Sequence, residues 1–248
     1  MIYYFSGTGN SSYIAEQAST ILSDSFSSII TPSAFSGDSL GLIFPVYAWG
    51  LPSVLEDFIS CKLQKLLGGK MPQYVYAIMT HGDDMGYADT ILRNELSKAG
   101  LPLHAAFSLA MPNTYVCLPG FDIDKEELAK AKVQASTNSL RSVCTSIKNR
   151  EGACDVTRGA IPFTKTYVLR PLFNRFLVTD RYFRSTTPQC TMCGKCAKQC
   201  PLNNIELSAG QVRWNGNCTG CLRCYHLCPN NAIQFGKFTK GKGQKQHL

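Results

Sequence analysis

A cysteine motif that occurs twice near the C-terminal end constrains this chain more than any other feature of its sequence. Each copy has the spacing C-x2-C-x2-C-x3-C followed by proline, and the second copy starts 28 residues after the first. Such a dense group at the end of an otherwise ordinary chain indicates metal binding rather than a disulfide framework. Eight of the 12 cysteines belong to the repeat: Cys190, Cys193, Cys196, Cys200, Cys218, Cys221, Cys224 and Cys228.

This spacing is the one that binds [4Fe-4S] clusters in bacterial ferredoxins. Three closely spaced thiolates bind one cluster, and the fourth cysteine reaches across to the other cluster. Zinc and disulfides are the alternatives, but four-cysteine zinc sites pair two doublets and need no triplet followed by Cys-Pro. Four protein ligands leave no iron open to substrate, so we expect the clusters to carry electrons. The predicted ligand sets are Cys190, Cys193, Cys196 and Cys228 for one cluster and Cys218, Cys221, Cys224 and Cys200 for the other.

Charge divides the chain into two unequal parts. Residues 1–150 carry 11 basic and 13 acidic side chains, whereas residues 151–248 carry 14 basic and 4 acidic ones. The basic part matches no nucleic-acid recognition motif, so we predict no nucleic-acid partner. We predict four segments: a first domain over 1–150, a basic aromatic connecting segment over 151–185, a cysteine domain over 186–236 and a flexible basic tail over 237–248.

The first part alternates short β-type runs with longer helical patterns, which is typical of a parallel sheet covered by helices on both faces. We predict a doubly wound α/β fold with a five-stranded parallel sheet, followed by a small α+β cysteine domain. Only a reduced crossover fits between the second and third strands. In the connecting segment, Pro162 and Pro171 are expected to break any long helix. The predicted strands are Ile2–Phe5, Phe26–Ile30, Leu40–Val46, Tyr74–Thr80 and Leu103–Ala110.

Three loops follow strands whose carboxyl ends should meet at one edge of this sheet. The loop from Ser6 to Ser11 opens a helix, and its backbone N–H groups and small side chains suit a phosphate. It lacks the lysine of a Walker loop and the third glycine of a dinucleotide loop. The loop from Pro45 to Gly50 offers two aromatic rings, and that from Thr80 to Gly86 offers polar groups. Together they favour an FMN site, although Trp49 as core and His81 as an exposed residue without a role are alternatives.

The first 150 residues resemble flavodoxin, and with the cysteine repeat the whole chain is similar to the flavodoxin-ferredoxin fusion proteins called ferrodoxins. The resemblance implies that the first loop binds the FMN phosphate and that the other two flank the flavin ring. It extends to the segment after the fifth strand. The implied FMN-binding residues are Ser6, Gly7, Thr8, Gly9, Asn10, Ser11, Tyr47, Ala48, Trp49, Gly50, Thr80, His81, Gly82, Gly86, Asn113 and Tyr115.

We therefore expect an iron-sulfur flavoprotein that passes electrons between two [4Fe-4S] clusters, FMN and a redox partner protein with an acidic docking face. One alternative is a flavin reductase that acts on an organic substrate or another small-molecule electron acceptor. Another is a docking scaffold that has lost its flavin. No residue is assigned a catalytic role. The chain start shows no signal peptide and no long apolar stretch, so we expect a cytoplasmic protein without a membrane span.

Overall fold

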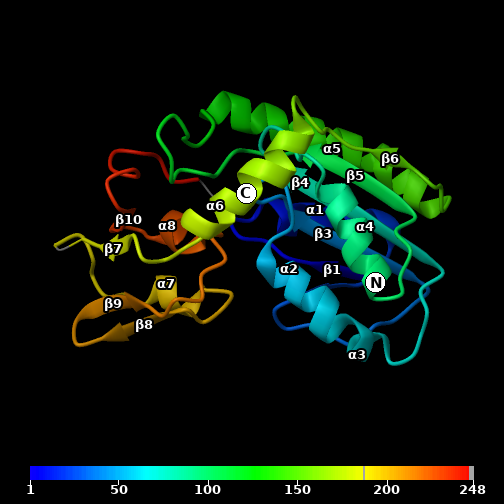
Figure 1. Ribbon diagram of the computed structural model, residues 1–248, viewed down its shortest axis with the longest axis horizontal. Helices are drawn as coiled ribbons and strands as arrows, with labels where there is room; N and C mark the ends of the chain where they lie inside the picture. The colour runs from blue at the N-terminus through cyan, green and yellow to red at the C-terminus, as the bar shows by residue number, and fades with distance from the viewer. Residues whose placement is uncertain (187, 246–248) are drawn as a thin grey trace.

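The computed structural model describes residues 1–186 and 188–245. Figure 1 shows an α/β domain built on one parallel sheet and, beside it, a smaller domain that carries the cysteines. The sheet has strand order β2-β1-β3-β4-β5-β6, and every neighbouring pair is parallel. The strands are β1 (Ile2–Tyr4), β2 (Phe26–Ser28), β3 (Ser39–Pro45), β4 (Tyr74–His81), β5 (Ala105–Ala110) and β6 (Cys154–Asp155).

The predicted fold class is confirmed, with one additional strand. β6 has only two residues, both exposed, so it carries no hydrophobic pattern that the sequence could reveal. The predicted reduced crossover is also present, because no helix lies between β2 and β3.

Helices cover both faces of the sheet because the strands bury both sets of alternating side chains. In β4, Val75 and Met79 belong to one core and Tyr76 and Ile78 to the other. One face is covered by α1 (Asn10–Leu22) and α5 (Glu126–Lys148). The other face is covered by α2 (Ser53–Asp57), η1 (Phe58–Lys62), α3 (Leu63–Leu67) and α4 (Ala88–Lys98).

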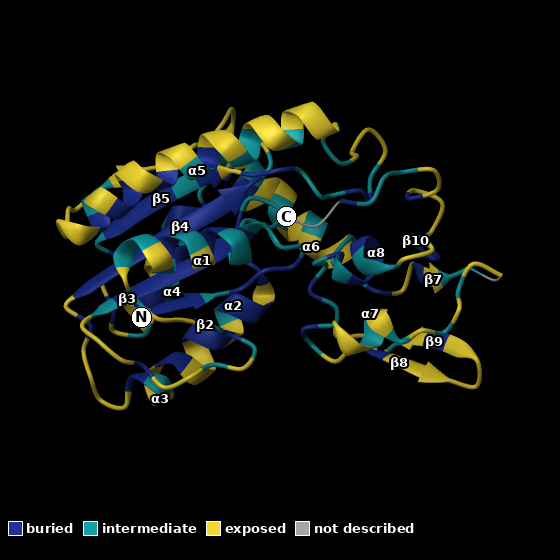
Figure 2. Cartoon of the chain, turned by 180° about the vertical axis from the view of Figure 1, so that it is seen from behind, coloured by how far each residue is buried: buried dark blue, intermediate teal, exposed yellow. Residues whose placement is uncertain are grey.

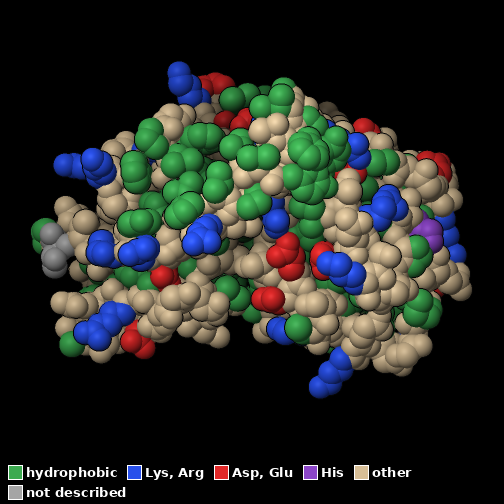
Figure 3. Space-filling model, viewed as in Figure 1, with side chains coloured by type: hydrophobic (Ala, Val, Ile, Leu, Met, Phe, Trp, Pro, Cys, Tyr) green, Lys and Arg blue, Asp and Glu red, His purple; other side chains and the backbone are tan. Residues whose placement is uncertain are grey.

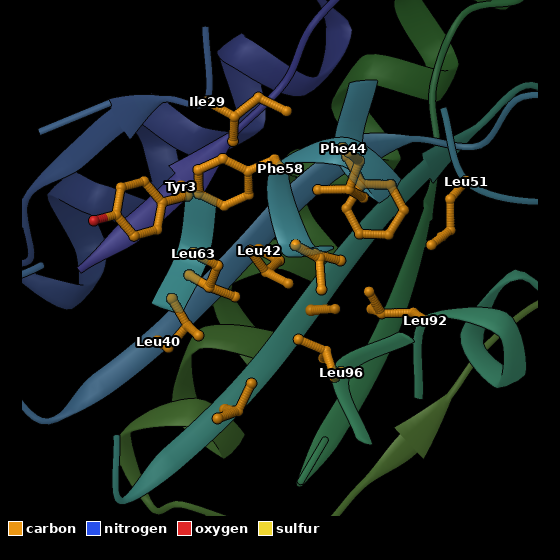
Figure 4. Close-up of a cluster of buried hydrophobic side chains, with 14 of the residues drawn as sticks. Tyr3, Ile29, Leu40, Leu42, Phe44, Leu51, Phe58, Leu63, Leu92 and Leu96 are labelled. Carbon is orange, nitrogen blue, oxygen red and sulfur yellow. The ribbon is translucent and has the colours of Figure 1, made fainter. Parts of the chain in front are cut away.

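Figure 4 shows the core between the sheet and helices α2, η1, α3 and α4. Phe58 and Leu63 from the helices meet Tyr3, Leu42 and Phe44 from the strands, and each is at most 1% exposed. The Tyr3 and Phe58 rings lie 5.2 Å apart between centroids, a favourable tilted contact. This core fixes the sheet, and with it the positions of the loops that follow the strands.

The connecting segment forms a continuous helical stretch, η2 (Thr164–Leu169) followed by α6 (Arg170–Phe176). The expectation that Pro171 breaks this helix is wrong. The turn before Pro171 is a π-helix, in which the Arg170 N–H bonds to the carbonyl of Lys165. Pro171 follows directly on this wide turn, which shifts the hydrogen-bond register at the position where Pro171 lacks an N–H.

The cysteine domain is small and has its own core. It contains β7 (Phe183–Ser185) paired with β10 (Ile233–Phe235), and β8 (Ile205–Ser208) paired with β9 (Gln211–Trp214). Two short helices, α7 (Lys195–Lys198) and α8 (Arg223–Leu227), each contain the third cysteine of a triplet, Cys196 and Cys224. The core residues include Ile205, Tyr225, Ile233 and Phe235.

A buried ion pair attaches the chain after β6 to helix α4. The Asp89 carboxylate is 5% exposed and bonds to Arg158 at 2.6 Å. We expect Arg158→Met to lower stability by about 2 kcal/mol, because it leaves a buried carboxylate without its partner. Anaerobic thermal unfolding measures this loss. Arg150→Met is the matched control, since it breaks the exposed pair with Asp38 and should leave the midpoint nearly unchanged. Equal midpoints for both variants would contradict the role of the Asp89 pair.

Candidate functional site

The eight repeat cysteines lie in two groups, each around its own pocket. Cysteines of the first triplet share a pocket with the last cysteine of the second copy, and the reverse holds for the second triplet. This is the crossed grouping that the repeat predicts, whereas ligation itself stays a prediction. The first pocket contains Cys190, Cys193, Cys196 and Cys228, and the second contains Cys200, Cys218, Cys221 and Cys224.

The two copies of the repeat also have the same local backbone. Left-handed conformations occur at Met192 and Gly194 in the first copy and at Gly220 and Leu222 in the second, which are 28 positions apart. Hydrogen bonds from backbone N–H groups to sulfur are repeated in the same way. Asn204 donates to Cys200 at 3.4 Å, and Ala232 donates to Cys228 at 3.2 Å.

The second pocket is the more buried of the two. Burial raises the pKa of Cys218 to about 12 and that of Cys221 to about 11. In the first pocket Cys193 is exposed. Among the described residues, no three His, Cys, Asp or Glu side chains are arranged to hold a single metal ion.

The second pocket lies directly against the carboxyl edge of the sheet. A Cβ at Gly7 would come within 2.9 Å of the Cys221 carbonyl oxygen and would also meet the hydroxyl of Tyr47. Close by, the hydroxyls of Ser53 and Thr219 are 3.2 Å apart. Gly7 therefore lets the first loop of the sheet domain touch the loop that carries Cys221.

Loops at this edge are joined to one another by side-chain hydrogen bonds. The Ser11 and Thr80 hydroxyls are 2.8 Å apart, and Asn10 donates to the carbonyl of Pro112 at 2.8 Å. Thr8 donates to Thr114 at 3.3 Å. A Cβ at Gly82 would lie 3.1 Å from the amide carbon of Asn113. The structure thus brings the first and third predicted loops together with the segment that contains Asn113 and Tyr115.

The aromatic loop has a strained backbone. Ala48 and Trp49 both have positive φ, at 46° and 58°, inside a turn closed by two bonds between Tyr47 and Gly50. Two successive non-glycine residues in this region cost about 1–3 kcal/mol each. Such strain is typical of functional loops.

Helix η2 covers this aromatic loop. Thr166 donates to the carbonyl of Trp49 at 3.2 Å, and the Lys165 ammonium lies 5.8 Å from the Trp49 ring. A side chain at Gly50 would collide with Arg170, and one at Gly86 would meet Thr166. In the structure these two glycines accommodate the connecting helix, a contact that the sequence did not indicate.

Two polar side chains at the edge have buried atoms with no hydrogen-bond partner of good geometry among the described residues. These atoms are the two ring nitrogens of His81 and the hydroxyl oxygen of Tyr115. Burial lowers the pKa of His81, so its neutral form is favoured at pH 7. The two aspartates that follow are balanced by lysines, since Asp84 pairs with Lys165 and Asp83 lies 3.9 Å from Lys132.

A polar pocket opens between the first loop and the cysteine domain. The sheet domain supplies Gly7, Thr8, Gly9, Ser12, Tyr13 and the acidic Glu16 to its lining, and the other side of the pocket carries three Lys and Arg side chains. The basic side chains come from three different elements and lie far from the loop in sequence, so no motif could have revealed them. They are Lys195 of α7, Arg223 of α8 and Lys245 of the tail.

Lys245 reaches the first loop directly. Its ammonium donates to the Thr8 carbonyl at 3.0 Å and to the Asn10 side-chain oxygen at 2.6 Å. Burial lowers the pKa of Lys245 to about 8. This lysine supplies the positive charge that the loop itself lacks.

The tail before Lys245 is attached to both domains. The Lys242 ammonium donates to the carbonyl of Val116 at 2.7 Å and to that of Leu118 at 2.6 Å. The Tyr225 hydroxyl donates to the carbonyl of Lys242 at 3.1 Å. We predicted a flexible tail over 237–248, whereas residues 242–245 make specific contacts; residues 246–248 lie outside the described residues.

The polar pocket has the chemistry of a phosphate site. It offers a helix N-terminus and three basic side chains to a phosphate. His81 and Tyr115 have unpaired polar atoms at the same edge of the sheet but do not line this pocket.

Comparison with known proteins identifies the cysteine domain. Residues 184–233 match the family model described as "4Fe-4S dicluster domain", so this part holds at least one iron-sulfur cluster. No curated protein gives a significant match to the chain. Among solved structures, "The Structure of Trp Repressor Binding Protein from Bacillus subtilis" is similar over 57% of this chain and 96% of that one. It is 12% identical with a TM-score of 0.38, too remote to carry an argument. No described helix has the length and apolar character needed to cross a membrane.

Proposed function

We propose that this protein transfers electrons through two [4Fe-4S] clusters and an FMN bound at the edge of the sheet. The iron-sulfur role rests on the 4Fe-4S dicluster match. The single observation that carries the proposal is the contact between Gly7 and Cys221, because it brings a predicted cluster ligand against the predicted phosphate loop.

The second cluster is supported by the equivalence of the two repeats. Each copy combines a cysteine triplet, a short helix and a fourth cysteine that accepts a backbone N–H bond. Because each pocket presents four cysteines on matching backbones, a cluster in one pocket supports the proposal of a cluster in the other.

FMN is supported by the polar pocket and the unpaired polar atoms. The N-terminal turn of α1 with Lys195, Arg223 and Lys245 would hold the phosphate, and His81 and Tyr115 would bond polar edges of the ring. When bound, FMN would supply chemistry that converts between one-electron and two-electron transfer. Burial raises the pKa of Cys221, and Arg223 lowers it by a smaller amount. The positive charge of Arg223 therefore acts on the second cysteine pocket as well as on the polar pocket.

The flavin-free scaffold is the second candidate. It is favoured by the cover that Thr166 and Lys165 place over the Trp49 loop, where the resemblance puts the flavin ring. Titration of the purified protein with FMN, followed by flavin fluorescence, separates the two. Binding of one FMN per chain supports the proposal, and no binding supports the scaffold.

The charge state of Lys245 should make FMN affinity depend on pH. Without ligand Lys245 loses its proton above about pH 8, since burial lowers its pKa from 10.5 to about 8. A bound phosphate favours the charged form, so binding above this pH must take up a proton. We expect the affinity to fall by up to about tenfold per pH unit from pH 8 upward. Dissociation constants measured between pH 7 and pH 10 test this.

Lys245→Met is the matching variant. It should weaken FMN binding by about tenfold at pH 7 and abolish the fall above pH 8, because one charge-assisted hydrogen bond is lost. Lys240→Met is the control, since Lys240 is an exposed lysine of the same tail. An unchanged pH profile in Lys245→Met would show that the phosphate does not bind in this pocket.

A further inference from the structure

The outer face of the connecting helix is apolar where a solvent-facing helix is normally polar. Phe163 is 64% exposed, Leu172 52% and Phe176 58%, and Tyr167 and Val168 between them are 46% and 49% exposed. Figure 2 shows η2 and α6 lying across the end of the sheet, with exposed residues along them. We call these five side chains the apolar ridge.

The inner face of the same helix is already used for packing. Thr166 is 2% exposed and bonds to the loops after β3 and β4, and Arg170 pairs with Glu56 at 2.9 Å. The helix is therefore fixed in position by its inner side. Tyr167 also contacts the Tyr87 ring, with 6.0 Å between centroids. The five ridge residues are nevertheless each at least 46% exposed while the helix is packed, so their exposure is a property of the folded chain.

The helix that carries the ridge is basic, and the acidic side chains Glu56 and Asp84 beside it already pair with its Arg170 and Lys165. No Asp or Glu occurs between Asp155 and Asp180. Arg175 lies 5.8 Å from the Phe176 ring and Arg181 5.6 Å from the Tyr182 ring. Among the described residues, neither arginine forms an ion pair with an acidic side chain. Figure 3 shows hydrophobic side chains across the upper part of this face, with both basic and acidic side chains near its lower border.

Three occupants could cover such a surface. A second copy of the chain seated ridge against ridge would offer Arg175 and Arg181 no acidic partner from the connecting helix, because no Asp or Glu lies between Asp155 and Asp180. A protein partner needs about one hydrogen bond per 100–200 Å² of interface. The outer face offers few polar side chains for that purpose, since Thr166 and Arg170 face inward and Asn174 follows Arg170 by one helical turn. A lipid surface needs no such set of hydrogen bonds, and its anionic headgroups would complement the arginines.

We propose that the apolar ridge is a peripheral docking surface for anionic lipid bilayers. The aromatic and aliphatic side chains enter the boundary between headgroups and acyl chains, and Arg175 and Arg181 bind the anionic headgroups. The helix lies along the surface and does not cross it. This docking is independent of whether FMN binds.

Sedimentation with lipid vesicles tests the proposal on the complete, iron-loaded protein. Vesicles of phosphatidylcholine with an equal part of phosphatidylglycerol should bind the protein, and binding to phosphatidylcholine alone should be at least about tenfold weaker. The variant Phe163→Ser/Leu172→Ser/Phe176→Ser should lower binding to the anionic vesicles at least about tenfold. Arg175→Gln/Arg181→Gln should lower it severalfold and weaken its dependence on salt.

The control is Met71→Ser, which removes an apolar side chain that is 62% exposed outside the ridge. It should bind vesicles as the unaltered protein does. Iron content and thermal midpoint confirm that each variant folds. Absence of vesicle binding, or equal binding by the ridge variant and the control, would overturn the proposal. A dimer in solution that the ridge variant abolishes would instead assign the ridge to self-association and would also overturn it.

Discussion

Cys200→Ala is expected to remove the cluster of the second pocket and leave that of the first. Cys200 follows the first triplet in sequence, yet it lines the pocket of Cys218, Cys221 and Cys224. Three remaining thiols should not retain the cluster through anaerobic purification. Iron should therefore fall from about eight to about four atoms per chain.

Double variants show to which pocket Cys200 belongs. Cys200→Ala combined with Cys221→Ala removes two ligands of one cluster, so iron should stay at about four per chain. Cys200→Ala combined with Cys193→Ala removes one ligand from each cluster, and iron should approach zero. The crossed grouping would be contradicted if iron approached zero in Cys200→Ala/Cys221→Ala and stayed at about four per chain in Cys200→Ala/Cys193→Ala. Cys61→Ser is the control, because this exposed cysteine lies on η1, outside both pockets.

Gly7→Ala is expected to disturb the contact between the two domains. The new Cβ would lie 2.9 Å from the backbone oxygen of Cys221, which cannot turn away as a side chain can. Overpacking of this kind costs about 1–3 kcal/mol, or roughly 2–10 °C in the thermal midpoint of a chain of this size. FMN binding should weaken as well, because the polar pocket is lined from both domains.

Gly152→Ala is the control for this substitution. A Cβ at Gly152 would lie 4.0 Å from the carbonyl oxygen of His104, so it fits without a clash. Its thermal midpoint and FMN affinity should match those of the unaltered protein. If Gly7→Ala also leaves both quantities unchanged, the contact between Gly7 and Cys221 does not hold the domains together.

Hydrophobic periodicity was sufficient to predict the sheet. The five predicted strands overlap β1 to β5. Their hydrophobic runs were recognisable because the strands are buried: β4 buries every residue, and β3 buries all but its two end residues. The chain between β2 and β3 is too short for a helix, and this too could be read from length alone. β6 could not be predicted, because its pairing depends on β5 and not on its own composition.

Site residues near a motif were predictable, and those brought in by tertiary structure were not. The cysteine spacing predicts the two groups because ligand spacing is local. Lys245 contacts Thr8 across 237 residues of sequence, and nothing in a Gly- and Lys-rich tail indicates that contact. Similarly, Gly50 and Gly86 were interpreted as cofactor-binding residues, whereas the structure shows both against the connecting helix.

The central claim is that one chain holds two [4Fe-4S] clusters and one FMN. Its most direct test is to purify the protein anaerobically and to measure iron, acid-labile sulfide and released flavin per chain. We predict about eight irons, about eight sulfides and one FMN. About four irons or fewer, or eight irons with no flavin even after FMN is added, would contradict the claim.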